Sequence, residues 1–394
     1  MLKDLCCILL LMAFCLSIPV VPPAWAEPEQ PPTSDVTTAK PVGLETTAEA
    51  AVLMDPISGK VLFEKNKDKR LPIASVTKIM TMLLTVEAIS KGEVSLEDTV
   101  KASENAAGMG GSQIFLAPEE EFSLYEMLVS IATSSANDAS VAVAEHLCGT
   151  VEEFVQKMNE KAKQLGLKNT HFINPTGLPA EGHYSSAYDQ AIILREAMKY
   201  PIFRKVSKIK EYDLRGGKFK LWNTNKLLWW YEGADIGKTG WTNEAKYCLS
   251  SSAERNGLRL ITVVLGCPEP KSHFRESMKI YNWGFAKFQA VTFAQAGDKI
   301  KTIAIDKGTS PTVDLVTPRK IAVVVPKGQT KGIDHYLDLP ERLTAPLERN
   351  QVVGHYIVTK NGTEILRFEI LTKQQVDKAT LQQEFFRVIN RICS

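Results

Sequence analysis

A serine and a lysine stand three residues apart where an apolar segment begins, in Leu71-Pro72-Ile73-Ala74-Ser75-Val76-Thr77-Lys78. Pro72 is typical of a chain that enters a helix, and an i, i+3 spacing places the Ser75 hydroxyl and the Lys78 amine on one face. A serine needs a base to become a nucleophile, and a lysine is a base only when it is neutral. Burial and a neighbouring cation would have to lower the lysine pKa from about 10.4. Taken alone, Ser-x-x-Lys is more often an ordinary helix start than a catalytic pair.

A second pattern, Ser135-x-Asn137, lies in the small-residue segment 134–138. Ser135 offers a hydroxyl for proton relay, and Asn137 offers an amide that can hold a substrate carbonyl. By itself the pattern is more often a helix interruption or a helix cap.

A third pattern, Lys238-Thr239-Gly240, lies in the segment Ile236-Gly237-Lys238-Thr239-Gly240-Trp241. Lys238 supplies a cation, Thr239 a hydroxyl, and Gly240 would let a substrate backbone approach a strand edge. By itself this tripeptide is also common in turns.

The surrounding elements indicate an α/β (α+β) fold in which helices cover an antiparallel sheet. Alternating or β-branched runs predict strands at 50–54, 60–63, 247–253 and 258–265, and Asn256-Gly257 predicts a hairpin between the last two. Helical patterns cover 75–90, 123–147, 151–165 and 273–288. The first two patterns fall within the predicted helices, and Lys238-Thr239-Gly240 lies just before the predicted hairpin strands.

The C-terminal third has a different character. Short β-branched runs separated by Gly, Pro and Asn predict a small all-β domain over 290–373. In the final segment, 374–394, an apolar stripe at helical spacing predicts an amphipathic helix; its members are Leu381, Phe385, Val388, Ile389 and Ile392. Such a helix either lies at a membrane surface or docks on its own domain.

The N-terminus predicts export. Residues 1–26 read as a signal peptide that is cleaved after Ala26, and the Pro- and Thr-rich stretch 27–44 reads as a flexible tether. The alternative is an uncleaved anchor, although the apolar run is shorter than the roughly 20 residues of a membrane span. We therefore expect an extracytoplasmic protein.

The overall composition limits the possible partners and cofactors. The 394 residues contain 47 Lys and Arg against 45 Asp and Glu, with 44% apolar residues. These values exclude wholesale disorder and a polytopic membrane protein, and the near-neutral charge argues against a nucleic-acid partner. Four cysteines follow the signal segment, at 148, 248, 267 and 393, without metal-ligand spacing. We expect no metal and no cofactor.

The order of the three patterns is more specific than any one of them. Ser-x-x-Lys, Ser-x-Asn and Lys-Thr-Gly follow one another as the corresponding motifs do in β-lactamases and penicillin-binding proteins. The chain resembles a low-molecular-mass penicillin-binding protein, a serine-type D-alanyl-D-alanine carboxypeptidase of peptidase family S11. Further similar segments are Gly111-Ser112-Gln113, 174–178 and 183–189. The resemblance implies a transpeptidase-like catalytic domain over 45–289.

The resemblance also implies roles for individual residues. Ser75 would be the acylated nucleophile, Lys78 its base, and Ser135 the proton relay to the leaving amine. Asn137 and Lys238 would lie beside the bound peptide, and Thr239 and Arg275 would hold the substrate carboxylate. Gly240 and Trp241 would lie on the strand edge along which the substrate binds. The backbone N–H groups of Ser75 and Trp241 would form the oxyanion hole. The implied partners are the peptidoglycan stem peptide, β-lactam antibiotics, and the outer face of the cytoplasmic membrane through the terminal helix.

Other functions remain open on the sequence alone. A serine β-lactamase, a D,D-endopeptidase and a non-catalytic penicillin sensor would use the same fold. The class A deacylation pattern Glu-x-x-Leu-Asn does not occur between Asn137 and Lys238. A zinc peptidase is disfavoured because His-Glu-x-x-His is absent from the sequence, and we interpret His171 and His183 as loop or core polar groups.

Overall fold

A computed structural model describes residues 43–392, and its centre is a five-stranded antiparallel sheet. The predicted signal peptide and nearly all of the predicted tether lie outside the described residues. The strand order is β2-β1-β9-β8-β7. The strands are β1 (Ala50–Met54), β2 (Val61–Lys65), β7 (Ala234–Thr242), β8 (Lys246–Arg255) and β9 (Leu258–Cys267). The predicted strands at 50–54, 60–63, 247–253 and 258–265 are all confirmed, to within a few residues at their ends.

The hairpin between β8 and β9 forms where the Asn-Gly pair predicts it. Asn256 and Gly257 have φ values of 48° and 75°, which suit a two-residue turn that follows the strand twist. Every residue of β1 is buried, because the strand is covered on both faces. Val52 packs into the core on one face and Leu53 into the core on the other.

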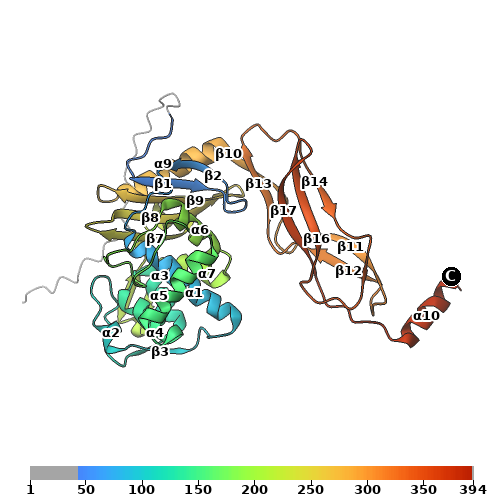
Figure 1. Ribbon diagram of the computed structural model, residues 1–394, viewed down its shortest axis with the longest axis horizontal. Helices are drawn as coiled ribbons and strands as arrows, with labels where there is room; N and C mark the ends of the chain where they lie inside the picture. The colour runs from blue at the N-terminus through green and yellow to red at the C-terminus, as the bar shows by residue number, and fades with distance from the viewer. Residues whose placement is uncertain (1–42, 393–394) are drawn as a thin grey trace, which may run out of the picture.

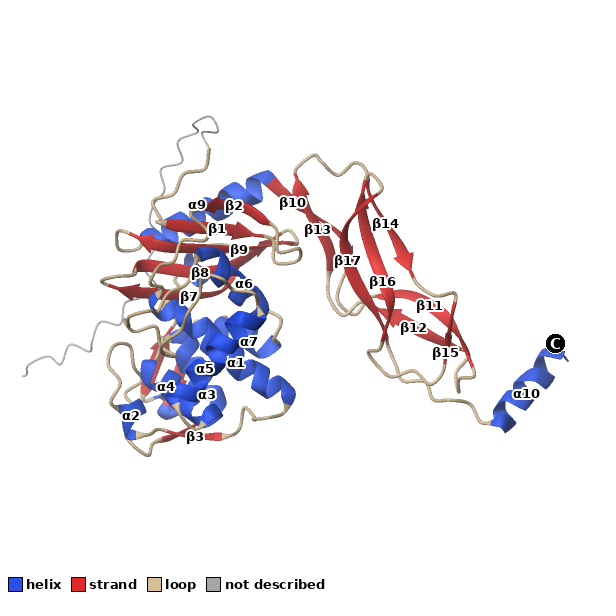
Figure 2. Cartoon of the chain, viewed as in Figure 1, coloured by secondary structure: helices blue, strands red, loops and turns tan. Residues whose placement is uncertain are grey.

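Helices cover both faces of this sheet (Figure 2). α9 (Ser272–Lys287) packs on β8 and β9 from one side, and most of the other helices lie on the opposite side. These helices are α1 (Lys78–Lys91), α2 (Glu104–Ala107), α3 (Leu124–Thr133), α4 (Asn137–Cys148), α5 (Val151–Gln164), α6 (Ala187–Ala197) and α7 (Pro201–Ser207). The short helix α8 (Leu227–Trp230) lies on the α9 side, where Trp230 contacts Phe274. Short pieces complete this part: the 3-10 helices η1 (Ala74–Thr77) and η2 (Arg215–Gly217), and the paired strands β3 (Thr99–Lys101) with β4 (Glu121–Ser123) and β5 (Glu211–Leu214) with β6 (Phe219–Trp222).

The predicted single helix over 123–147 is wrong in one respect, because the chain forms two helices, α3 and α4. α3 begins with a capping box between Ser123 and Glu126. The break occurs at Ser135, whose φ of 64° is left-handed and cannot continue a right-handed helix. Such a conformation is costly for a residue with a side chain and is often found at functional sites. The break leaves Ser135 outside both helices and places Asn137 at the start of α4.

A second, all-β part follows α9 without a loop, since β10 begins at Phe288. Figure 1 shows it extending away from the central sheet as an elongated body. It contains a two-stranded sheet and a six-stranded sheet around its own apolar core. The strands are β10 (Phe288–Ala294), β11 (Lys299–Asp306), β12 (Thr312–Val316), β13 (Ile321–Pro326), β14 (Ile333–Asp338), β15 (Arg342–Thr344), β16 (Val352–Lys360) and β17 (Thr363–Thr372).

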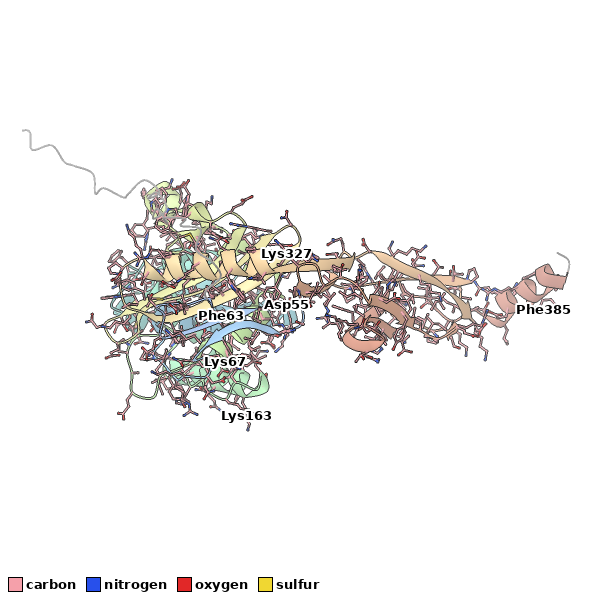
Figure 3. All side chains as sticks on the ribbon, turned by 90° about the horizontal axis from the view of Figure 1, so that it is seen from above. Asp55, Phe63, Lys67, Lys163, Lys327 and Phe385 are labelled. Atoms are coloured by element: carbon pink, nitrogen blue, oxygen red, sulfur yellow. The ribbon has the colours of Figure 1, made fainter. Side chains whose placement is uncertain are left out.

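The last helix, α10 (Leu381–Ile392), lies at the far end of the β domain, where Figure 3 labels Phe385. Two of its apolar side chains are largely exposed, Leu381 by 92% and Phe385 by 63%. The helix touches the β domain through Arg387, which donates to the Gly308 carbonyl at 2.6 Å. Docking of the apolar stripe on the β domain is therefore not observed for Leu381 and Phe385. Within residues 43–392, no helix combines the length and the apolar character that a membrane crossing requires.

Candidate active site

Ser75 lies in η1, and Lys78 begins α1 one turn later. Lys78 Nζ hydrogen-bonds to the Ser75 hydroxyl at 2.8 Å and donates to Asn137 Oδ1 at 2.7 Å and to the Thr176 carbonyl at 2.7 Å. The Lys78 side chain is completely buried. The predicted pairing of the two side chains on one face is confirmed.

The surroundings of Lys78 favour its neutral form. Burial holds the pKa of Lys78 well below its usual value, and repulsion from Lys238 lowers this pKa further, against a smaller opposing effect of the Asp138 carboxylate. The sequence argument required both burial and a nearby cation, and burial is the larger effect. The lowered pKa favours the neutral amine, which is the form that can accept the Ser75 proton.

Lys238 forms a second serine–lysine pair. Its ammonium nitrogen donates to Ser135 Oγ at 2.8 Å and to the Thr239 carbonyl at 3.0 Å. Burial lowers the pKa of Lys238 to about 7. The hydroxyl of Thr239 donates to that of Thr224 at 2.8 Å, a residue that the sequence analysis did not single out. The site thus contains two hydroxyl–amine pairs, Ser75 with Lys78 and Ser135 with Lys238.

The structure gives a reason for glycine at position 240 that the sequence argument missed. A Cβ at this position would lie 2.6 Å from the Ile73 carbonyl oxygen and 3.0 Å from the Ser75 backbone nitrogen. The glycine therefore lets β7 pack directly against η1, which holds the Ser75 backbone beside the strand. Trp241, the next residue, is 54% exposed at the edge of the site.

A loop at 174–178 closes the site beneath Lys78. Asn174 Oδ1 accepts from the backbone nitrogens of Thr176 and Gly177, at 3.1 and 2.7 Å, and this fixes the Thr176 carbonyl toward Lys78. The sequence comparison marked this segment as similar to the family but gave it no role. The loop contributes the backbone carbonyl of Thr176, and because every residue has such a carbonyl, no residue type in the sequence indicates this role.

His183 is a core polar group, in agreement with the sequence interpretation. Burial lowers its pKa to about 4, so the ring is neutral. Its Nδ1 accepts from the Ile173 backbone nitrogen at 3.2 Å, which leaves Nε2 to donate to Thr77 Oγ1 at 2.8 Å. His183 therefore supports η1 from behind and does not face the cavities.

Two cavities meet at Ser75, and Ser112 and Trp241 border both. One, of about 550 Å³, contains Ser135 and Thr239, and we call it the leaving-group cavity. The other, of about 540 Å³, includes Asn137, Gly177 and Leu178. An extended peptide could therefore cross Ser75 with a segment on each side.

Arg275 is the one candidate residue that the structure does not bring to the others. It does not belong to the lining of either cavity, and its guanidinium pairs with Glu269 at 3.0 Å on the surface of α9. The expectation that it holds the substrate carboxylate together with Thr239 is therefore not supported by the geometry.

Replacing Lys238 with methionine should shift the acid limb of the acylation rate toward higher pH. Lys238 is protonated in acid, so its repulsion acts there, and its removal would raise the pKa of Lys78. Protonated Lys78 cannot act as base, so the rate would begin to fall at a higher pH in the variant. Pre-steady-state acylation by a β-lactam across pH measures this. The control is Lys279→Met, on the exposed side of α9, which should leave the acid limb of the pH–rate profile unchanged. An unshifted acid limb in Lys238→Met would contradict the repulsion between Lys238 and Lys78.

Comparison with known proteins agrees with this geometry. Residues 35–269 match the peptidase S11 family, described as D-alanyl-D-alanine carboxypeptidase, and residues 288–378 match the penicillin-binding protein 5 C-terminal domain. The D-alanyl-D-alanine carboxypeptidase DacF of Bacillus subtilis is 43% identical over 336 residues, which are 84% of this chain and 86% of DacF. DacC of Escherichia coli is 36% identical over 84% of each chain. The crystal structure of penicillin binding protein 5 from Haemophilus influenzae aligns with a TM-score of 0.67 and 34% identity, over 86% of this chain and all of that one.

The fold and the site define a serine hydrolase of the penicillin-binding type. The chain belongs to the peptidase S11 family of D-alanyl-D-alanine carboxypeptidases.

Proposed function

We propose that this chain removes the terminal D-alanine from peptidoglycan stem peptides through an acyl-enzyme on Ser75. The observation that carries the proposal is the 2.8 Å contact between the Ser75 hydroxyl and a buried Lys78 whose pKa is held low. Family membership supplies the substrate class.

The residues can divide the reaction into two acyl-transfer steps, acylation and deacylation of Ser75. Ser75 Oγ attacks the carbonyl carbon of the penultimate D-alanine while Lys78 takes the hydroxyl proton. The backbone N–H groups of Ser75 and Trp241 stabilise the oxyanion. Ser135, bonded to Lys238, passes a proton to the leaving nitrogen, and the C–N bond breaks to release D-alanine. The proton that Lys78 took from Ser75 replaces the one that Ser135 gave up, so both groups return to their starting protonation states. In the second step Lys78 takes a proton from water, the oxygen of that water attacks the ester carbon, and Lys78 returns the proton to Ser75 Oγ as the ester bond breaks.

A Ser75→Ala variant should lose all covalent labelling by penicillin. The β-lactam ring presents a reactive amide beside a carboxylate, as the terminal dipeptide does, and its opening would leave an ester on Ser75. Intact-mass spectrometry of the wild type should show one added penicillin mass. A labelled Ser75→Ala protein, or an unlabelled wild type, would sink the assignment of the nucleophile.

Product analysis tests the substrate class. The wild type should release D-alanine from diacetyl-L-lysyl-D-alanyl-D-alanine and should regain free Ser75 within the assay. Preferred cleavage of a crosslinked muropeptide would indicate an endopeptidase instead, and rapid hydrolysis of penicillin would indicate a β-lactamase.

We also propose that the protein is exported, with residues 1–26 removed and 27–44 as a tether to a catalytic domain over 45–289. The β domain would span 290–373, and segment 374–394 would attach the protein to the outer face of the cytoplasmic membrane. Support for attachment comes from α10, whose exposed apolar side chains include Phe385 and Phe386, exposed by 63% and 54%. Apolar side chains on an isolated amphipathic helix favour a lipid interface.

Removing α10 should release the protein from vesicles of phosphatidylethanolamine and phosphatidylglycerol. The cut belongs after Ala379, because residues 376–379 still bond to the β domain, for example from the Ala379 backbone nitrogen to the Lys307 carbonyl. All the proteins compared, with and without α10, should begin at Glu27, so that the N-terminal apolar run does not bind lipid. A Phe385→Ser/Phe386→Ser protein should behave as the truncated one does in flotation. Equal flotation of all three proteins would show that α10 is not an anchor.

A further inference from the structure

The cavity that lies across Ser75 from the leaving-group cavity has a single charged residue in its described lining. This second cavity, of about 540 Å³, includes Asn137 but not the proposed proton relay Ser135, and we call it the acyl-side cavity. Its described lining contains one acidic residue, Glu244, and no lysine, arginine or histidine. The cavity is therefore suited to a peptide segment that carries a positive charge.

Glu244 lies in an ordered turn between β7 and β8. The Thr242 hydroxyl accepts from the Ala245 backbone nitrogen at 3.0 Å, and the Cys248 thiol donates to the Ala245 carbonyl at 3.3 Å. Ala245 is only 2% exposed, so side chains satisfy both of its backbone polar groups inside the fold. Glu244 is exposed beside it, and within the described part of the chain no hydrogen bond or ion pair involves its carboxylate. The turn therefore holds an unpaired carboxylate at the edge of the acyl-side cavity.

The course of β7 places this carboxylate on the acyl side of the bond that is cut. Thr239 lines only the leaving-group cavity, and Thr242 lines only the acyl-side cavity, so the strand passes from one cavity to the other beside Ser75. A peptide extended along the strand advances about 3.3 Å per residue. The residue that precedes the penultimate D-alanine would therefore lie beside Trp241 and Thr242. A lysine there has a flexible four-carbon stem, which is long enough to bring its amine to the turn.

We propose that Glu244 selects stem peptides in which the residue before the two D-alanines carries a free side-chain amine. The inference rests on the proposed function, because that function fixes which part of the substrate enters the acyl-side cavity. The protonated amine and the Glu244 carboxylate would form an ion pair at the cavity edge. An exposed pair contributes modestly to binding, and dissolved salt weakens it. Glu244 would therefore determine specificity and take no part in the proton transfers at Ser75.

The test compares Nα-acetyl-L-lysyl-D-alanyl-D-alanine, whose side-chain amine is free, with the diacetyl peptide, whose side-chain amine is blocked. At low salt the wild type should cleave the free-amine peptide with a kcat/KM about two- to fivefold higher. The difference should lie in KM and not in kcat, because the ion pair is remote from the reacting bond and stabilises bound substrate and transition state equally. It should fade at roughly 1 M salt, where charges are screened beyond about 3 Å.

Two variants of Glu244 and one control locate the source of the preference. Glu244→Gln should lower kcat/KM for the free-amine peptide to the value for the diacetyl peptide, and Glu244→Asp should keep part of the difference. Glu152→Gln is the matched control, since Glu152 is an exposed glutamate on α5 that lines neither cavity. It removes the same charge from the protein and should keep the full preference.

The outcomes separate this inference from the proposed function. An equal or reversed preference in the wild type at low salt, a preference that survives Glu244→Gln, or one that salt does not weaken would overturn the role of Glu244. Release of D-alanine from either peptide would still uphold the proposed function. If neither peptide released D-alanine, the proposed function itself would be refuted, and this inference would fall with it.

Discussion

Lys78→Met should reduce the rate of Ser75 acylation by a factor of about 10³ or more. A positioned general base contributes roughly 10² to 10⁴ to a rate, and here the base lies 2.8 Å from the hydroxyl that it must deprotonate. Methionine is close to lysine in length and apolar, so it fits a completely buried position. It would leave the Thr176 carbonyl and Asn137 Oδ1 without their present partner, at a cost of about 1–3 kcal/mol for each group. We expect a folded protein with a lower Tm and almost no acylation.

Stopped-flow acylation and circular dichroism together separate the two effects. Lys161→Met is the matched control, because Lys161 is also a largely buried lysine but pairs with Glu87 at 2.8 Å, away from both cavities. It should lose stability without losing acylation. Near-normal acylation in Lys78→Met would show that another group serves as base.

Gly177→Ala should destabilise the fold by more than about 3 kcal/mol and disorganise the site. A Cβ at this position would lie 1.9 Å from the Ala74 carbonyl oxygen and 2.8 Å from Thr77 Oγ1, which no relaxation of a side-chain tip can relieve. The backbone φ of 82° adds strain for any residue with a side chain. Because Gly177 adjoins Thr176, a forced shift would also move the carbonyl that holds Lys78. The variant should therefore unfold at a lower urea concentration, and penicillin should acylate it more slowly.

Gly166→Ala isolates the conformational part of this effect. Gly166 has a similar φ of 70°, but nothing lies within 4 Å of the Cβ that it would gain. Its substitution should cost only about 1–2 kcal/mol and leave acylation unchanged. Equal losses of stability in the two variants would show that η1 and the 174–178 loop can separate at little cost.

Sequence reasoning performs well here where chemistry depends on local spacing. The i, i+3 relation between Ser75 and Lys78 alone brings the two side chains together, and the Asn256-Gly257 pair alone specifies the turn of the β8–β9 hairpin. The antiparallel sheet, the covering helices and the C-terminal β domain follow from periodicity. Ser135 and Lys238 could be joined only through the resemblance, since 103 residues separate them.

The remaining features depend on backbone geometry that residue types do not encode. The Thr176 carbonyl reaches Lys78 across 98 residues, and any residue at 176 would present a carbonyl. The helix over 123–147 was predicted as continuous because its apolar pattern runs through Ser135, whose left-handed φ has no compositional marker. Arg275 lies outside the lining of both cavities for a related reason. A helix projects residues two positions apart about 200° from each other, so the surface that each side chain of α9 faces depends on where the helix begins.

The β domain joins the catalytic part through ordered structure and without a flexible linker. β10 continues directly from α9, the Lys327 backbone nitrogen donates to the Lys287 carbonyl at 2.8 Å, and Lys320 Nζ donates to the Gly257 carbonyl at 2.6 Å. α10 lies at the opposite end of this elongated domain (Figure 1). With α10 on a bilayer, the length of the β domain would set the height at which Ser75 works. Lengthening or shortening that domain would then change which layer of the cell wall is trimmed, while the chemistry at Ser75 stays the same.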